Sequence, residues 1–193
     1  MELMKLLETR RTYRRFDQSK KLPENVINDI IKSIGLVSSA ANLQPLRYTF
    51  VTEEVMTEKL FNSVKWAARL PKELGTPKEG EKPVMYVVVW YDEKDKNTWI
   101  DIDLGLAISN MTLAAWNHGV GSCIFGSMNP KEVRDLMGYN KNAIVSSIIA
   151  FGYPTHTSTL IEMEDNQVAY SLDNEKNYIV PKRKLEDIVE ICK

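Results

Sequence analysis

Hydrophobic and polar positions follow helical spacing in several parts of the chain. The clearest case is residues 26–34, where valine and isoleucine recur at intervals of about four residues. Comparable patterns predict helices over residues 2–10, 53–66 and 130–137, and at the C-terminal end, where one side carries Leu185, Ile188, Val189 and Cys192. The longest predicted helix spans residues 99–117, and apolar side chains nearly encircle it. We therefore expect that helix to be central and buried.

Continuous apolar runs predict strands between these helices. Val84–Trp90 and Ile144–Phe151 have the composition of strands buried on both faces, and Tyr48–Val51 and Tyr178–Val180 are shorter candidates. Few buried strands mixed with helices indicate an α+β or α/β domain with one central sheet covered by helices. The length of 193 residues fits a single domain, 1–193. The polar segment 155–180 is long for a connector, so it is either a flexible excursion or an arm that packs on another subunit.

Composition and charge exclude several classes of protein. Hydrophobic residues make up 44% of the chain and charged residues 26%, which is typical of a globular domain and not of a disordered one. The formal net charge of −1 disfavours a dedicated nucleic-acid binder. Cys123 and Cys192 are too few for a disulfide framework, so we expect two reduced, mostly buried thiols. Without an apolar stretch suited to a secretory signal or a membrane span, the expected location is the cytoplasm.

Two basic clusters stand out against this nearly neutral background. Four arginines fall within residues 10–15, and Lys182, Arg183 and Lys184 open the predicted last helix. Cations at the beginning of a helix oppose its dipole, whereas a phosphate bound there would be favourable. The two clusters therefore suggest one shared anion, with Thr12 offering a hydroxyl beside the arginines. The alternative is two solvated basic faces with ordinary salt bridges.

The remaining polar segments suit a flat, heterocyclic ligand better than side-chain catalysis. The loop Ser38–Pro45 has small residues and two amides, Asn42 and Gln44, that can pair with the edge of a heterocycle. The glycine-rich segment 119–126 is not a dinucleotide fingerprint, because Ile124 stands where its third glycine would be. We find no metal-ligand spacing and no dedicated acid–base set, with the two histidines, His118 and His156, far apart. These features favour a cofactor that carries the chemistry itself.

Together these segments resemble the nitroreductase family of FMN-dependent oxidoreductases over essentially the whole chain. The matching positions are Arg10, Arg11, Thr12, Arg14 and Phe16; Ser39, Asn42, Gln44 and Pro45; Gly119, Gly121 and Ser122; Gly152, Tyr153 and Pro154; and the basic group Lys182, Arg183 and Lys184. The resemblance implies an α+β nitroreductase-like fold, with a central, mostly antiparallel sheet flanked by helices. It also implies a domain-exchanged homodimer with FMN at the subunit interface and an arm of about 155–181 on the partner.

The resemblance further implies a set of cofactor-binding residues. The phosphate, ribityl chain and pyrimidine edge would be held by Arg10, Arg11, Thr12 and Arg14, and the phosphate site would be completed by Lys182, Arg183 and Lys184. The partner subunit would contribute Ser38, Ser39, Ala40 and Asn42, and Gln44 is a further candidate. The isoalloxazine would lie beside Ile124, Phe125 and Gly126, with a backbone N–H toward N5. The implied activity is ping-pong hydride transfer from NAD(P)H through FMN to an electron-poor acceptor such as a nitroaromatic or a quinone. No catalytic side chain is expected, but Arg14 is our candidate for stabilising anionic reduced flavin. The alternative is a non-catalytic FMN-binding or anion-binding protein.

Overall fold

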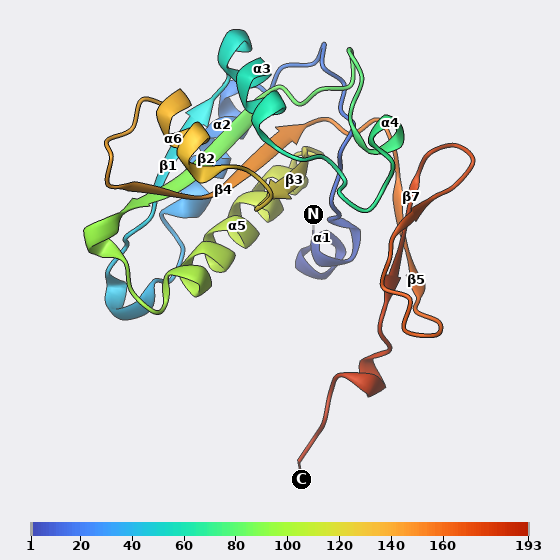
Figure 1. Cartoon of the computed structure of the whole chain (residues 1–193). Helices are drawn as coiled ribbons and strands as arrows, with labels where there is room; N and C mark the ends of the chain where they lie inside the picture. Colours follow the sequence, from blue (N-terminus) through green and yellow to red (C-terminus); the bar gives the residue numbers. More distant parts are fainter. Residues whose placement is uncertain (1, 193) are drawn as a thin grey trace.

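The computed structural model, which describes residues 2–192, is built around one four-stranded antiparallel sheet (Figure 1). Its strands lie in the order β1-β2-β4-β3, and each neighbouring pair is antiparallel. The strands are β1 (Arg47–Val51), β2 (Met85–Asp92), β3 (Gly121–Phe125) and β4 (Ala143–Gly152). The helices are α1 (Leu3–Thr9), α2 (Glu24–Ile34), α3 (Glu54–Ser63), α4 (Lys72–Gly75), α5 (Ile100–Asn117) and α6 (Pro130–Leu136), with short 3₁₀ turns η1 (Ala40–Asn42), η2 (Glu93–Asp95) and η3 (Leu185–Asp187). The α+β class with an antiparallel central sheet is thus confirmed.

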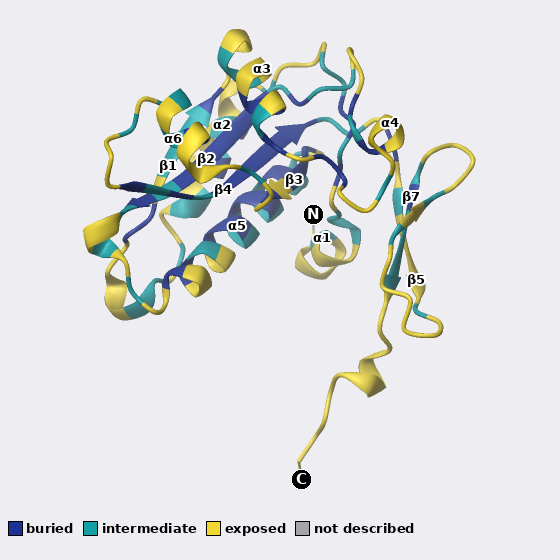
Figure 2. Cartoon of the chain, viewed as in Figure 1, coloured by how far each residue is buried: buried dark blue, intermediate teal, exposed yellow. Residues whose placement is uncertain are grey.

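Two helices cover each face of this sheet. Alternate residues of β2 point to opposite sides: Met85, Val87 and Val89 pack with α2 and α5, whereas Tyr86 and Val88 pack with α3 and α6. Both faces of β2 and β4 are therefore buried, as their continuous apolar sequences predict (Figure 2). No helix within residues 2–192 is both long and apolar enough to cross a membrane.

Helix α5 differs from the expectation of a buried central helix. Only one of its sides packs on the sheet and on α2, through residues such as Ala107 and Met111. On the other side Ile102 is 53% exposed, and Leu106 and the preceding Trp99 are exposed as well. The prediction was wrong because apolar residues around a helix favour its burial but do not provide a second surface to pack against. In this structure the sheet and α2 cover only one side of α5.

The C-terminal end also departs from its prediction. The 3₁₀ turn η3 is the only helical structure among residues 185–192, and the apolar side chains expected on one helical face are exposed. Cys192 is exposed rather than buried. A short amphipathic helix is marginal without a surface to pack against, and within residues 2–192 the apolar side chains of this segment stay exposed. Lys182, Arg183 and Lys184 therefore do not open an α-helix, contrary to the prediction.

Residues 158–182 form a separate arm beside the main sheet. Strands β5 (Ser158–Glu162), β6 (Ser171–Leu172) and β7 (Tyr178–Lys182) lie in the order β5-β7-β6, with β5 parallel and β6 antiparallel to β7. The arm extends away from the body and is largely exposed (Figures 1 and 2). The buried Arg15 fastens it to the body, since its guanidinium donates a hydrogen bond to the carbonyl of Lys176.

Candidate functional site

The arginine-rich segment leaves helix α1 and runs along the open edge of the sheet. α1 ends at Thr9, and beyond it Thr12 bridges Ser122 of β3, while the N–H of Tyr13 donates to the carbonyl of Ser122 at 2.9 Å. This approach needs a glycine at 121, where a Cβ atom would lie 2.7 Å from the ring of Tyr13. The arginines are therefore presented from an extended chain and not from helical faces.

A pocket of about 190 Å³ lies between this segment and the arm. Its walls are Arg10, Arg11, Thr12, Arg14, Ser158, Leu160, Tyr170, Val180 and Lys182. The structure thus brings the arginine segment together with Lys182, the first residue of the second basic cluster. The other two lie outside this pocket: Arg183 donates to Asn166 Oδ1 at 2.9 Å, and Lys184 pairs with Glu162 at 3.0 Å.

The charge of this pocket is positive and uncompensated. The pKa of Arg11 is lowered, mainly because the side chain is partly buried and further because the like charge of Arg10 lies nearby. The Arg11 guanidinium donates to the carbonyls of Leu7 and Arg10 near the end of α1, which satisfies it without neutralising it. Within residues 2–192 no acidic side chain lines the pocket, and the buried Arg10 Nε and Ser158 Oγ atoms have no hydrogen-bond partner. Unpaired donors beside half-buried arginines are suited to an anion with several oxygens, such as a phosphate.

The arm holds Arg14 in place. The Arg14 guanidinium carbon lies 4.7 Å from the ring centroid of Tyr170 and 4.9 Å from that of Tyr178. Its backbone N–H donates to Nε2 of His156 at 3.0 Å. Tyr170 and Tyr178 of the arm therefore orient the Arg14 guanidinium. The sequence analysis did not identify either tyrosine as part of the site.

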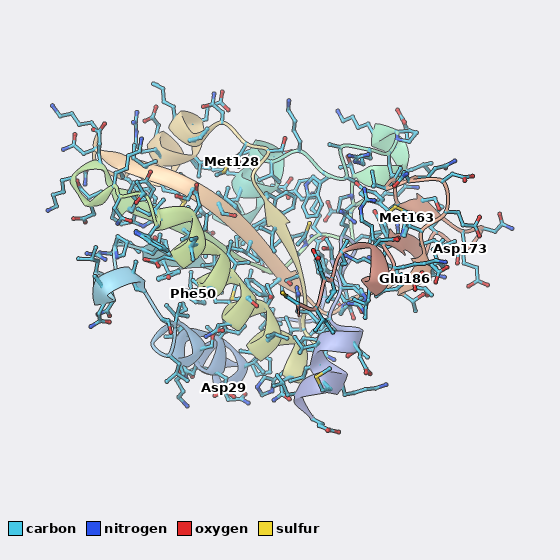
Figure 3. All side chains as sticks on the ribbon, turned by 90° about the horizontal axis from the view of Figure 1, so that it is seen from below. Asp29, Phe50, Met128, Met163, Asp173 and Glu186 are labelled. Carbon is cyan, nitrogen blue, oxygen red and sulfur yellow. The ribbon has the colours of Figure 1, made fainter. Side chains whose placement is uncertain are left out.

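Two candidate acid–base or nucleophilic groups, His156 and Cys123, are held in inactive forms by burial. Burial lowers the pKa of His156 to about 4, and its Nδ1–H donates to the carbonyl of Thr157, so the ring is neutral at pH 7. Burial raises the pKa of the Cys123 thiol to about 11, which keeps it protonated. His118 pairs with Asp29 of α2, which Figure 3 places on the far side of the molecule from Met163 and Asp173 of the arm.

The open edge of β3 is accessible through Ile124 and Gly126. Ile124 is 44% exposed, whereas Phe125 is 4% exposed and packs edge-on against Trp66 at 4.7 Å. The Phe125 carbonyl accepts from Ser147 of β4, so the backbone of Phe125 faces β4 and that of Ile124 faces the open edge. Ile124 and Gly126 are therefore exposed at this surface as predicted residues, whereas the side chain of Phe125 points into the core.

The loop with the remaining predicted residues lies at the beginning of α5. Ser38, Ser39 and Ala40 line an open, apolar hollow of about 610 Å³ together with Trp99, Ile102 and Leu106. In the same loop Asn42 and Gln44 are exposed, and Gln44 Nε2 donates to Asn42 Oδ1 at 3.2 Å. This loop and its hollow are therefore open toward solvent in the single chain.

The two groups of predicted residues lie at opposite ends of α5 (Figure 1). Asp103, near its beginning, contacts the loop through Ser39, and Trp116, near its end, donates to Thr9 beside the arginine segment at 2.8 Å. Thirteen residues at 1.5 Å each separate Asp103 from Trp116 by about 20 Å. The loop and the arginine segment of one chain therefore do not form one pocket.

Comparison with protein families gives one match that covers most of the chain. The sequence model of the Nitroreductase family matches residues 7–153. A relative from Archaeoglobus fulgidus, named "Putative NADH dehydrogenase/NAD(P)H nitroreductase", is 28% identical over 173 residues, which cover 85% of this chain and 92% of that protein.

Solved structures share the fold at lower identity. An FMN-dependent nitroreductase from Clostridium difficile has a TM-score of 0.68 at 19% identity and covers 90% of this chain and 96% of its own. A structure from Desulfovibrio desulfuricans titled "putative nitroreductase in complex with fmn" has a TM-score of 0.68 at 15% identity, with 88% and 95% covered.

Proposed function

Because the chain belongs to the nitroreductase family, we propose that it is an FMN-dependent oxidoreductase. It transfers hydride from NAD(P)H to an electron-poor acceptor, such as a nitroaromatic or a quinone, in a ping-pong sequence. The observation that carries the proposal is the basic pocket between the arginine segment and the arm, with its unpaired Arg10 Nε and Ser158 Oγ atoms. The names of the relatives support the same cofactor and reductant.

The donor set of this pocket fits the phosphate end of FMN. Arg10, Arg11 and Lys182 supply positive charge, and Thr12 and Ser158 supply hydroxyl groups. A phosphate at this position would occupy the unpaired donors and offset the repulsion between neighbouring arginines. We expect Arg183 and Lys184 to contribute less to phosphate binding, because both side chains already have partners on the arm.

The edge of β3 is suited to the isoalloxazine end. The N–H of Ile124 lies on the open edge, where a planar ring system can approach without displacing the buried Phe125. FMN held there would supply the redox chemistry, because a flavin can take up hydride from NAD(P)H and pass it to an acceptor. Arg14, fixed by the two arm tyrosines, would contribute positive charge to the reduced cofactor. His156 and Cys123 would take no part in proton transfer, because burial keeps one neutral and the other protonated.

We further propose that the site is completed by a second copy of the chain. The loop Ser38–Gln44 lies too far from the arginine segment of its own chain to share a ligand with it, so a partner must bring its loop to the pocket. Exposed apolar residues on α5 and on the C-terminal end, such as Ile102, Leu106 and Ile188, are suited to an interface between copies. The arm, which has few contacts with its own body beyond its base, would then extend over the partner.

A visible absorption spectrum of the purified protein tests the cofactor. We expect a yellow protein whose flavin absorbance is bleached by NADH or NADPH without oxygen and restored by a quinone or a nitroaromatic. A protein that stays yellow with both nucleotides would be a non-catalytic FMN binder. A colourless protein that does not bind added FMN would contradict the proposal, and salt-sensitive binding of polyanions would then favour an anion-binding function.

A further inference from the structure

We propose that Asp103 is a positioning residue, which holds the loop Ser39–Gln44 in the shape that receives the flavin ring of the partner subunit. The inference rests on the proposed function, and it assigns a role to a residue outside the expected cofactor contacts. Asp103 is 3% exposed and lies in the first turn of α5, directly beneath the loop.

The hydrogen bonds of Asp103 tie both ends of the loop to α5. Its Oδ2 accepts from the hydroxyl of Ser39 at 2.7 Å, and its Oδ1 accepts from the N–H of Ala40 at 3.0 Å. The Ser39 hydroxyl in turn accepts from the N–H of Gln44 at 3.0 Å. One buried carboxylate therefore anchors the start of the loop directly and its end through a single serine.

The backbone of the loop needs such an anchor. Ala41, Asn42 and Gln44 have φ angles of 48°, 54° and 49°, in the left-handed region that is unfavourable for residues with a Cβ atom. Asparagine tolerates this region, but Ala41 and Gln44 are strained there, and no glycine relieves that strain. Residues held in such conformations persist when surrounding contacts fix them, and here those contacts converge on Asp103.

The carboxylate has no other partner that would explain its burial. Among the ion pairs within residues 2–192, none includes Asp103, and both of its oxygens are used by the loop. A buried carboxylate is costly unless hydrogen bonds satisfy it, so the loop and Asp103 stabilise one another. Asp103 also lines the hollow beside the loop, but it is only 3% exposed and both of its oxygens are bonded to Ser39 and Ala40, so it acts on a ligand chiefly through the loop.

The test compares Asp103→Asn with Asp101→Asn, an exposed aspartate two residues earlier on the same helix. Asparagine keeps the shape but has one acceptor in place of two, so it cannot serve both Ser39 and Ala40. In the protein without flavin, we expect amide hydrogen exchange at Ala40 and Gln44 to become at least tenfold faster in Asp103→Asn and to stay unchanged in Asp101→Asn.

Flavin titrations then separate the loop from the phosphate pocket. Asp103→Asn should raise the dissociation constants of FMN and riboflavin by about the same factor, at least tenfold, and should change the shape of the bound-flavin absorption bands. Arg10→Ala should weaken FMN and leave riboflavin nearly unchanged, because riboflavin has no phosphate. Ser39→Ala keeps the buried carboxylate but removes the hydroxyl that links it to the N–H of Gln44. Because Ser39 is itself a predicted flavin contact, its readout is hydrogen exchange at Gln44 in the flavin-free protein, which should become faster and serves if Asp103→Asn does not fold.

The outcomes distinguish the two proposals. If the wild-type chain binds neither flavin, the proposed function fails and the loop has no flavin to receive. If the wild type binds FMN and the Asp103→Asn variant binds it as tightly as Asp101→Asn, the role of Asp103 is overturned while the proposed function stands. Unchanged hydrogen exchange at Ala40 and Gln44 in Asp103→Asn, or at Gln44 in Ser39→Ala, would also overturn it.

Discussion

The backbone N–H of Arg14 donates a hydrogen bond to the Nε2 atom of His156, so a neutral imidazole joins the arginine segment to the base of the arm. The bond requires an unprotonated Nε2, and burial favours that form by lowering the pKa of His156 to about 4. Protonation would replace an acceptor with a donor that faces another donor. The attachment of the arm is therefore sensitive to acid.

The first prediction concerns stability in acid. The unfolded chain protonates this histidine near its ordinary pKa of 6.5 and the folded chain only near 4, so the unfolded state binds more protons between these values. The contribution of neutral His156 is complete above pH 6.5 and is lost as the pH falls to 4, at a cost of about 3 kcal/mol in the free energy of unfolding. Denaturant titrations should show this loss in the wild type and in His118→Gln. In His156→Gln, which keeps an acceptor but does not titrate, the loss should be absent; an equal loss there would assign it to another group.

The second prediction separates the two neighbouring cations of the basic tail. Lys182 lines the pocket, whereas Arg183 is engaged with Asn166 on the arm. Loss of a charge-assisted hydrogen bond costs about 1.5–3 kcal/mol, so Lys182→Ala should raise the dissociation constant of FMN by roughly 10- to 100-fold. Arg183→Ala should change it less than about threefold. Fluorescence titration with FMN measures both, and the opposite order would place the phosphate outside this pocket.

The third prediction concerns the apolar side of α5. Ile102→Glu introduces a charge on the face that we propose to be covered by a second copy, so the chain should become monomeric and lose bound FMN. Val55→Glu is the matched control, since Val55 on α3 is also exposed but lies far from that face. Sedimentation velocity at micromolar concentration, with detection at the flavin wavelength, reports assembly and cofactor together. A flavin-loaded wild-type monomer would contradict the proposed assembly.

The fourth prediction concerns Cys123, which adjoins the surface proposed for the flavin. Because burial keeps its thiol protonated, Cys123→Ala should leave the anaerobic rate of flavin reduction by NAD(P)H within about tenfold of the wild type. Loss of an acid–base group typically costs 10²–10⁴-fold. Stopped-flow absorbance measures the rate, and a loss of that size with FMN still bound would give the thiol a chemical role.

The elements that could be predicted from the sequence are those whose patterns reflect burial within one chain. β2 and β4 are continuous apolar runs because the sheet is covered on both faces, and Asn129 caps α6 as its side chain indicates. β3 gave no such signal, because it begins with glycine and serine and becomes a strand only through pairing with β4. The C-terminal pattern was misleading, since helical spacing does not supply a surface to pack on.

Sequence reasoning about the candidate site anticipated that basic residues from distant segments lie together, but it did not anticipate the geometry around them. The expectation of one shared anion linked Arg10 and Lys182, which the structure brings to the same pocket. Nothing in the sequence pattern marked Ser158 and Tyr170 as site residues, because they reach the pocket only through the folding of the arm beside the arginine segment. From the sequence, Asp103 differs from Asp101 only in the side of the helix that it faces. Its contacts could not be predicted, because they come from a loop about sixty residues earlier in the chain.

The placement of the loop and the arginine segment at opposite ends of α5 has a genetic consequence. If each site combines the arginines of one copy with the loop of the other, a chain altered only in its loop and a chain altered only at Arg10 are each defective at every site. In a mixed pair, one site would receive both defects and the other would receive none. Two inactive variants produced in the same cell would therefore complement one another, and at most one site in each mixed pair would recover.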